Sequence, residues 1–243
     1  MRGTNPIAKF ISAPPIGEPV AYQVHEIFLT LQGEGPRSGQ RAVFIRLSGC
    51  HLKCSFCDTH WDDVKDPLMS IVDIVSEVSR LWGHGIGRSP LVVLTGGEPT
   101  RQPIDSLVSI LINQYNATVQ IETAGTFYRD CMLLGNVETI VSPKTPHVDP
   151  RVAQQAHAYK YIISAGDEFC PHTGVPITAT QAGARPARLA TPPLHLPRQR
   201  IYLSPCDSGN AKLNEKNLQC AAALAIKHGY TLMVQLHKLA MLP

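Results

Sequence analysis

The chain alternates short apolar runs with stretches in which apolar residues recur at helical spacing. A short apolar run is typical of a buried strand, whereas the helical recurrence is typical of an amphipathic helix. We expect strands over residues 43–47, 91–94, 118–121, 137–141, 159–163, 200–203 and 231–235.

The helical stretches have recognisable ends. Apolar residues recur at helical spacing over residues 71–81, and Ser70 stands before them as the expected N-cap. Pro103 can open a second helix, and a third helix over residues 214–228 is expected to end at Gly229. Strands that alternate with helices predict right-handed crossovers and an α/β fold with a mainly parallel sheet.

The length of 243 residues indicates one main domain, within the range of an α/β barrel. Residues 1–20 mix Pro, Gly and small residues without periodicity, and predict a loose extension before a main domain over residues 21–243. Residues 165–198 are rich in Pro, Gly, Ala and Thr and lack apolar periodicity. We interpret them as a long insertion that acts as a lid or as a partner-contact loop.

Composition excludes several classes of function. The formal net charge of +3 comes without a concentrated stripe of Lys and Arg, so nucleic-acid binding is not expected. No apolar run approaches the length of a membrane span, so no membrane association is expected. The seven cysteines are odd in number and unevenly spaced, which indicates free thiols in a reducing compartment rather than a disulfide framework. We therefore expect a cytoplasmic protein.

Three of these cysteines stand on one loop after the predicted strand 43–47. Cys50, Cys54 and Cys57 have the spacing C-x3-C-x2-C. Three thiolates can hold three irons of a 4Fe-4S cluster and leave the fourth iron without a protein ligand. The alternative is a zinc site with three cysteines and one histidine, with His51 or His60 as the fourth ligand. The spacing alone leaves both interpretations open.

Further motifs follow the next predicted strands. Residues 95–99 read Thr-Gly-Gly-Glu-Pro, residues 122–126 read Glu-Thr-Ala-Gly-Thr, and residues 142–144 read Ser-Pro-Lys. The carboxyl ends of parallel strands meet at one edge of a sheet, so these motifs and the cysteine loop are expected to converge on one pocket. The two glycines allow the backbone to approach a ligand closely, and Glu98 stands beside them. A plain turn between strand and helix is the alternative for this motif.

The cysteine spacing followed by Gly-Gly-Glu-Pro resembles the radical S-adenosylmethionine (SAM) superfamily. A closer resemblance extends over Tyr22 to Pro243: residues 30–35, 44–50, 57–59, 122–126, 142–144 and 235–238 resemble, in order, motifs of the 7-carboxy-7-deazaguanine synthase family of the queuosine pathway. The implied fold is a modified, incomplete β/α barrel. In the superfamily, the open iron binds the methionine moiety of SAM, and an electron from the cluster cleaves SAM to a 5′-deoxyadenosyl radical.

The resemblance also implies an activity. Members of the family convert 6-carboxy-5,6,7,8-tetrahydropterin to 7-carboxy-7-deazaguanine by a ring contraction with loss of ammonia, a carbon–nitrogen lyase reaction. The implied cofactors are a 4Fe-4S cluster, SAM and Mg2+. The implied partners are the small-molecule substrate, an external flavodoxin-like one-electron reductant and a second copy of the chain in a homodimer.

The resemblance implies roles for particular residues. Cys50, Cys54 and Cys57 would bind the cluster, and Thr59 would bind Mg2+, a hard ion that prefers oxygen ligands. The implied SAM contacts are Phe56, Cys57, Asp58, Gly125, Ser142, Pro143, Lys144, Ser204, Pro205, Cys206 and Asp207. The implied substrate contacts are Leu31, Gln32, Gly33, Arg46, Thr123 and the terminal carboxylate of Pro243. Glu34 and His237 are further candidate substrate contacts.

Several of these residues have simpler interpretations. Arg46 could point outward from an edge strand, although an inward guanidinium would hold a substrate carboxylate, and we favour the inward orientation. Thr59 could cap a turn, and Pro243 could end a frayed tail. His237 could be a satisfied buried histidine, and Glu34 a solvated turn residue.

Two departures from the family pattern affect the site. Residues 204–206 read Ser-Pro-Cys where the family often has Gln-Pro-Met, so side-chain contacts there are in doubt. Residues 235–238 read Gln-Leu-His-Lys instead of Gln-Thr-His-Lys, which removes a hydroxyl. Two other functions compete: an activase that makes a glycyl radical on a protein partner, and a non-catalytic iron–sulfur or zinc module.

Overall fold

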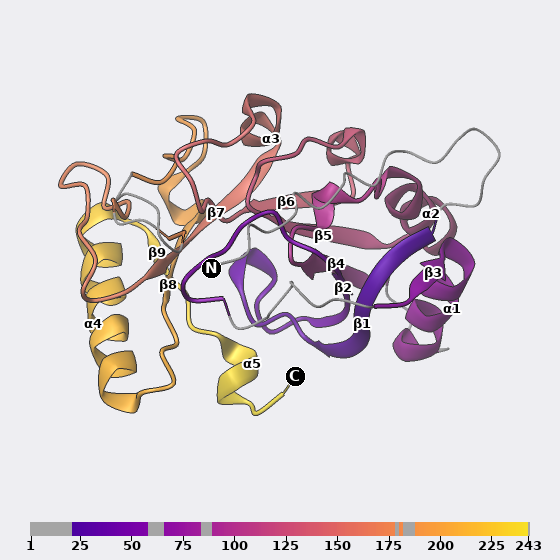
Figure 1. Ribbon diagram of the computed structural model, residues 1–243, viewed down its shortest axis with the longest axis horizontal. Helices are drawn as coiled ribbons and strands as arrows, with labels where there is room; N and C mark the ends of the chain where they lie inside the picture. The colour runs from indigo at the N-terminus through magenta and orange to yellow at the C-terminus, as the bar shows by residue number, and fades with distance from the viewer. Residues whose placement is uncertain (1–20, 58–65, 84–88, 178–179, 182–187, 243) are drawn as a thin grey trace, which may run out of the picture.

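A nine-stranded sheet forms the centre of the protein, which we describe from a computed structural model covering residues 21–57, 66–83, 89–177, 180–181 and 188–242 (Figure 1). The strands are β1 (Ala21–Leu31), β2 (Arg41–Leu47), β3 (Leu68–Ser70), β4 (Leu91–Gly96), β5 (Thr118–Thr123), β6 (Val137–Val141), β7 (Ala156–Ile163), β8 (Ile201–Pro205) and β9 (Thr231–Leu232). Their order in the sheet is β3-β1-β2-β4-β5-β6-β7-β8-β9.

The sheet is mainly parallel and open. β1 pairs antiparallel with β2 and β3, and every pair from β2 to β9 is parallel. The first and last strands of this order do not pair with each other, so the sheet does not close. This arrangement confirms the predicted incomplete β/α barrel.

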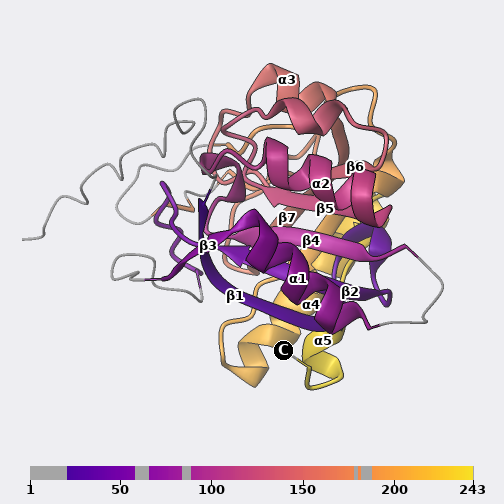
Figure 2. The ribbon, with the colours of Figure 1, turned by 90° about the vertical axis from the view of Figure 1, so that its right-hand side faces the viewer.

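Five α-helices are seen within the described part of the chain: α1 (Ile71–Trp82), α2 (Asp105–Tyr115), α3 (Pro150–Gln154), α4 (Ala211–His228) and α5 (Leu236–Leu239). In Figure 2, α1, α2 and α3 follow one another along one face of the sheet. Ser70 caps α1 as predicted: its hydroxyl accepts a hydrogen bond from the Asp73 amide at 3.2 Å. α4 ends at Gly229, whose φ of 69° lies in the left-handed region that glycine adopts at little cost. None of the described helices is long and apolar enough to cross a membrane.

Several predicted boundaries were wrong. α2 begins at Asp105, two residues after Pro103, and α4 begins at Ala211 because Asn210 caps it by accepting a hydrogen bond from the Leu213 amide. The strand expected over residues 231–235 ends at Leu232. The chain leaves the sheet there and starts α5, whose Leu236 amide donates to the Gly33 carbonyl at 3.1 Å. α3 and α5 are too short to produce a periodic apolar signal.

Alternation along the strands separates a helix-covered face from a polar face. The residues of β2, β5 and β7 that enter the main hydrophobic core include Val43, Ile45, Val119, Ile121, Tyr159 and Tyr161. Their neighbours Phe44, Arg46, Glu122, Lys160 and Ile162 line a cavity on the other face. Because side chains of a strand point alternately to opposite faces, the same strands supply both the core and the cavity wall.

The described parts of residues 165–198 contain no helix or strand before the 3-10 helix η4 (Arg198–Arg200) begins. They nevertheless pack tightly, because Val175, Leu189 and Leu196 are buried in the main core. The Tyr161 hydroxyl, from β7, donates a hydrogen bond to the Ala190 carbonyl at 2.6 Å. This segment is therefore anchored against the sheet.

Candidate active site

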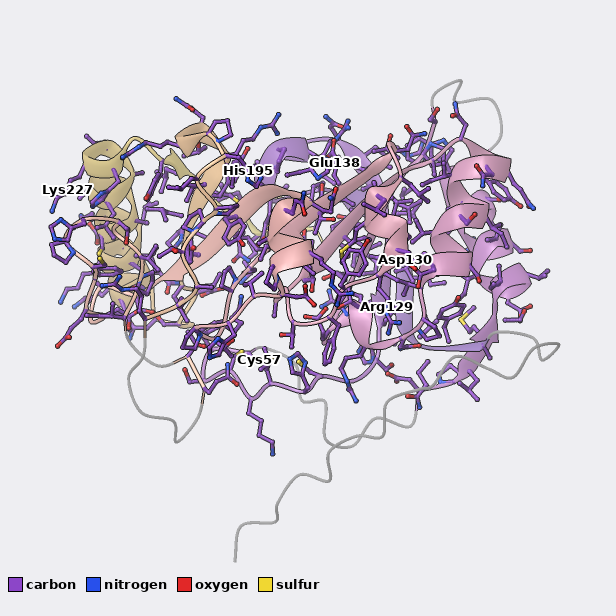
Figure 3. All side chains as sticks on the ribbon, turned by 90° about the horizontal axis from the view of Figure 1, so that it is seen from above. Cys57, Arg129, Asp130, Glu138, His195 and Lys227 are labelled. Atoms are coloured by element: carbon purple, nitrogen blue, oxygen red, sulfur yellow. The ribbon has the colours of Figure 1, made fainter. Side chains whose placement is uncertain are left out.

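A cavity of about 340 Å3 lies where the predicted motifs converge. Its walls are Phe28, Thr30, Leu31, Gln32, Glu34, Phe44, Arg46, Cys50, Leu52, Cys54, Phe56, Cys57, Thr95, Gly96, Gly97, Glu122, Thr123, Ala124, Ser142, Lys144, Lys160, Ile162, Pro205, Cys206, Asp207, Gln235, His237 and Lys238. Figure 3 shows Cys57 near one edge of the molecule and Glu138, which lies near the start of β6, toward the opposite edge. The cavity therefore opens at the carboxyl ends of the parallel strands, as predicted.

The structure brings most of the predicted site residues to this cavity. Those that line it are Leu31, Gln32, Arg46, Cys50, Cys54, Phe56, Cys57, Thr123, Ser142, Lys144, Pro205, Cys206 and Asp207, together with the candidates Glu34 and His237. Gly33, Gly125, Pro143 and Ser204 do not line it. Asp58, Thr59, His60 and Pro243 lie outside the described residues. The roles of all these residues, including those that line the cavity, stay predictions.

The thiols of the cysteine loop line the cavity together. Cys50 and Cys54 are half-buried and Cys57 is exposed. Burial raises the pKa of the Cys50 thiol to about 11 and also raises the pKa of Cys54. Metal binding to these thiols would therefore displace protons.

No described group of three or more His, Cys, Asp or Glu side chains surrounds a point where one metal ion could sit. A zinc site needs such convergence, whereas a cluster keeps its thiolates apart by its own width. His51, one candidate zinc ligand, is engaged elsewhere: its Nε2 lies 3.0 Å from Thr126 Oγ1, and its ring packs edge-on against Phe127. Of the two candidate zinc ligands, His51 is thus already engaged, and His60 lies outside the described residues.

The turn after β4 lies directly against the cysteine loop. The Gly97 amide donates to the Leu47 carbonyl at 3.2 Å, and the Glu98 amide donates to the Gly49 carbonyl at 3.0 Å. A Cβ on Gly96 would lie 2.0 Å from the Leu47 oxygen, and one on Gly97 would lie 2.2 Å from the Gly49 oxygen. The two glycines therefore permit a close approach of two backbones, in addition to the ligand approach expected from the sequence.

Glu98 fixes this turn from inside. Its carboxylate is 1% exposed and accepts hydrogen bonds from the Thr100 hydroxyl at 2.6 Å, the Thr123 hydroxyl at 2.7 Å and the Ala124 amide at 2.7 Å. These bonds join the end of β4 to the end of β5. Both carboxylate oxygens are thus used internally, so Glu98 holds the wall in place.

Lys160 is the functional candidate that the sequence interpretation missed. Its ammonium, 10% exposed, lies between two carboxylates on the cavity face: it pairs with Glu34 and lies 3.1 Å from Glu122. Burial alone would lower the pKa of Lys160, but Glu122 and Glu34 outweigh burial and raise it. The signal in the sequence that could have indicated this residue was a single lysine in the otherwise apolar run 159–163.

Three glutamines complete this buried network. Gln32 and Gln120 donate to Glu122 at 3.0 and 3.2 Å, and Gln235 donates to Glu34 at 2.7 Å. Burial alone would raise the pKa of Glu34, but Lys160 and Gln235 hold it at about 2. The network therefore presents fixed carboxylate charges in a partly desolvated cavity.

A second lysine stands beside the cysteine loop. Lys144 Nζ donates to the Ser142 carbonyl at 2.8 Å and to the Ser142 hydroxyl, and lies 5.9 Å from the centre of the Phe56 ring. Burial, followed by the charge of Lys160, lowers the pKa of Lys144 to about 8. Three residues with predicted SAM contacts are thus held together.

Arg46 faces the cavity rather than away from the sheet. Its Nε lies 2.7 Å from Glu26 Oε1 in ion-pair contact, and its guanidinium lies 5.7 Å from the centre of the Phe28 ring. Phe28 in turn stacks on Phe44 at 5.3 Å between ring centres. One wall of the cavity therefore carries the two stacked rings of Phe28 and Phe44 with the Arg46 guanidinium beside them.

The C-terminal residues close one side of the cavity. Lys238 pairs with Asp207 at 2.5 Å, and this hydrogen bond is the main reason that the pKa of Asp207 is lowered. A Cβ on Gly33 would lie 1.9 Å from His237 Nδ1, so a side chain at this position would exclude the imidazole. Burial lowers the pKa of His237.

Comparison with known proteins identifies the family. The sequence model of the Radical SAM superfamily matches residues 44–167. A 7-carboxy-7-deazaguanine synthase of Rhodospirillum rubrum is 38% identical over 247 residues, which cover 98% of each chain. The chain belongs to the 7-carboxy-7-deazaguanine synthase family.

Other relatives agree. The 7-carboxy-7-deazaguanine synthase of Rickettsia prowazekii is 34% identical, over 98% of this chain and 94% of its own. The crystal structure of QueE from Escherichia coli has a TM-score of 0.62 and 24% identity, over 89% of this chain and 95% of that one, which supports the fold. Membership in this radical SAM family implies an enzyme of the lyase class that uses a 4Fe-4S cluster and SAM.

Gly97→Ala tests the close approach of the two turns in this 7-carboxy-7-deazaguanine synthase family member. A Cβ there would also lie 2.9 Å from Cys50 Cβ, so the cysteine loop must shift. We expect bound iron to fall several-fold while the circular dichroism spectrum keeps its native shape. Gly135→Ala is the matched control, because nothing lies within 4 Å of a Cβ at Gly135. Normal iron content in Gly97→Ala would contradict the argument.

Lys160→Met tests the buried charge network. Removal of one partner from a buried ion pair costs about 3–5 kcal/mol, because here Glu34 and Glu122 lose their cation. The depressed pKa of Glu34, about 2, means that its contribution is complete above its ordinary pKa of 4.5 and is lost as pH falls toward 2. The cost of the substitution should therefore be largest near neutral pH and shrink in acid, where the unpaired carboxylates become protonated.

Urea denaturation of the reduced protein at several pH values measures this cost. Lys212→Met, at an exposed position near the start of α4, should change the free energy of unfolding by less than about 0.5 kcal/mol. An equally small effect for Lys160→Met at neutral pH would show that the network carries no stability.

Proposed function

We propose that the protein is a Mg-dependent 7-carboxy-7-deazaguanine synthase that converts 6-carboxy-5,6,7,8-tetrahydropterin to 7-carboxy-7-deazaguanine with loss of ammonia. The observation that carries the proposal is one cavity lined by the radical SAM cysteine loop and by the buried Glu34, Glu122 and Lys160 network. Relatives that match over nearly the whole chain support it.

The charge pattern of the cavity suits a carboxylated pterin. The aminopyrimidinone ring of a pterin presents N–H groups, for which the Glu34 and Glu122 carboxylates are acceptors. Its carboxylate would pair with Arg46 beside the aromatic rings of the cavity wall. We propose Leu31, Gln32, Gly33, Arg46, Thr123 and the terminal carboxylate of Pro243 as substrate contacts, with Glu34 and His237 as further candidates.

The proposed cluster ligands are Cys50, Cys54 and Cys57, and the cluster with SAM would supply the radical that starts the reaction. The proposed SAM contacts are Phe56, Cys57, Asp58, Gly125, Ser142, Pro143, Lys144, Ser204, Pro205, Cys206 and Asp207. Lys144 and Ser142 are held beside Phe56, which supports a preformed site. For Ser204, whose side chain is buried away from the cavity, the proposed contact is through the backbone.

Magnesium is assigned to Thr59 on the family motif. A threonine hydroxyl is a hard oxygen ligand, and Mg2+ keeps several positions for water or substrate oxygens. The ion would orient the substrate carboxylate. We further propose a flavodoxin-like one-electron reductant, a homodimer and a cytoplasmic location, with residues 21–243 as the radical SAM domain, 1–20 as an extension and 165–198 as an insertion.

Anaerobic turnover of the carboxytetrahydropterin tests the proposed reaction. The cluster-loaded protein with SAM, Mg2+ and a strong reductant should form the deazapurine, detected by absorbance and mass. Cys54→Ala should lose both the cluster and the product. Zinc instead of iron and sulfide, with no SAM cleavage, would overturn the proposal. Substrate-independent SAM cleavage without product would reject the substrate alone.

Thr59→Ala tests the magnesium ligand. We expect the variant to keep wild-type iron and sulfide content but to lose the stimulation of turnover by Mg2+. Thr59→Ser keeps the hydroxyl and should keep most of the stimulation. Equal Mg2+ stimulation of the alanine variant and the wild type would reject Thr59 as the ligand.

A further inference from the structure

One side chain of the long segment 165–198 reaches the cysteine loop. Gln181 Nε2 lies 3.3 Å from Cys54 Sγ, within the range of a hydrogen bond to sulfur. Gln181 Oε1 accepts a hydrogen bond from the Lys53 amide at 2.8 Å. Because a backbone N–H can only donate, this bond fixes the oxygen on the Lys53 side and turns the NH2 group toward the sulfur.

Backbone contacts hold the glutamine in this position. Gln181 and Cys54 form an antiparallel bridge, and the Ser55 amide donates to the Thr180 carbonyl at 2.8 Å. Gln181 Nε2 also lies 3.4 Å from the Lys144 carbonyl. Residues 180–181 therefore join the cysteine loop to the turn after β6.

The glutamine contacts Cys54 without lining the cavity. Cys54 lines the cavity, whereas Gln181 is not among the lining residues. The contact between Gln181 and Cys54 thus comes from the long segment and not from the cavity wall.

We propose that Gln181 sets the reduction potential of the cluster by donating a hydrogen bond to the Cys54 thiolate. The inference rests on the proposed role of Cys54 as a cluster ligand. Reduction adds one negative charge to the cluster, so the ligand sulfur becomes a stronger hydrogen-bond acceptor. The donor stabilises the reduced form more than the oxidised form and raises the potential.

Two substitutions isolate this donor. Gln181→Glu keeps an acceptor for the Lys53 amide but removes the NH2 group, and Gln181→Met removes both functions in a side chain of similar length. Gln219→Glu is the control for added charge, since Gln219 is exposed on α4 and bonds only to Glu215 among the described side chains. Redox titration of the loaded protein, followed by electron paramagnetic resonance of the reduced cluster, measures the midpoint potential.

We expect both Gln181 variants to disfavour reduction by up to about tenfold, which is about 59 mV for one electron. Gln219→Glu should match the wild type. Iron and sulfide content, measured in every sample, reports the cluster separately. An unchanged potential in a fully loaded Gln181→Glu protein would overturn the inference and leave the proposed function intact.

Failure of both Gln181 variants to retain iron would also overturn it, because Gln181 would then act in cluster retention rather than on the potential. A wild-type protein that holds no cluster would instead reject the proposed function itself.

Discussion

The close contact between the turn after β4 and the cysteine loop is the constraint on which the site depends. Two backbones meet there with no room for a side chain: the Gly97 amide donates to the carbonyl of Leu47, at the end of β2, and the Glu98 amide donates to the carbonyl of Gly49. The buried Glu98 carboxylate then extends the same contact to β5. Since an unpaired buried carboxylate is strongly destabilising, the three strand ends are fixed relative to each other before any cofactor binds.

The charged residues on the polar face of the sheet are not arranged for stability. A lysine on β7 and two carboxylates, one on β5 and one just after β1, are a poor way to gain stability, because desolvation offsets most of their attraction. This arrangement instead provides charges that are already oriented and partly desolvated. A substrate that carries several N–H groups then meets acceptors that need little reorganisation.

Much of this arrangement could be predicted from the sequence, for identifiable reasons. Ser70 and Gly229 were found because caps depend on local backbone geometry, and the strand ends converged because parallel sheets place them together. Lys160 was missed because its role depends on Glu34 and Glu122, which are distant in the sequence and meet only in the folded sheet. The strand expected over residues 231–235 was predicted three residues too long, because its end is decided by where α5 docks.

The long segment 165–198 connects the hydrophobic core to the cysteine loop. Its composition predicted a loop and nothing about its target, since a single glutamine without periodicity carries no local signal. In the structure, the apolar residues Val175, Leu189 and Leu196 anchor the segment in the core, and that anchoring carries residues 180–181 to the cysteine loop. Cys54 thus lines the cavity, while its sulfur also contacts Gln181 of this segment. With Cys54 as the proposed cluster ligand, the proposed hydrogen bond would let a distant part of the chain act on the cluster through this contact.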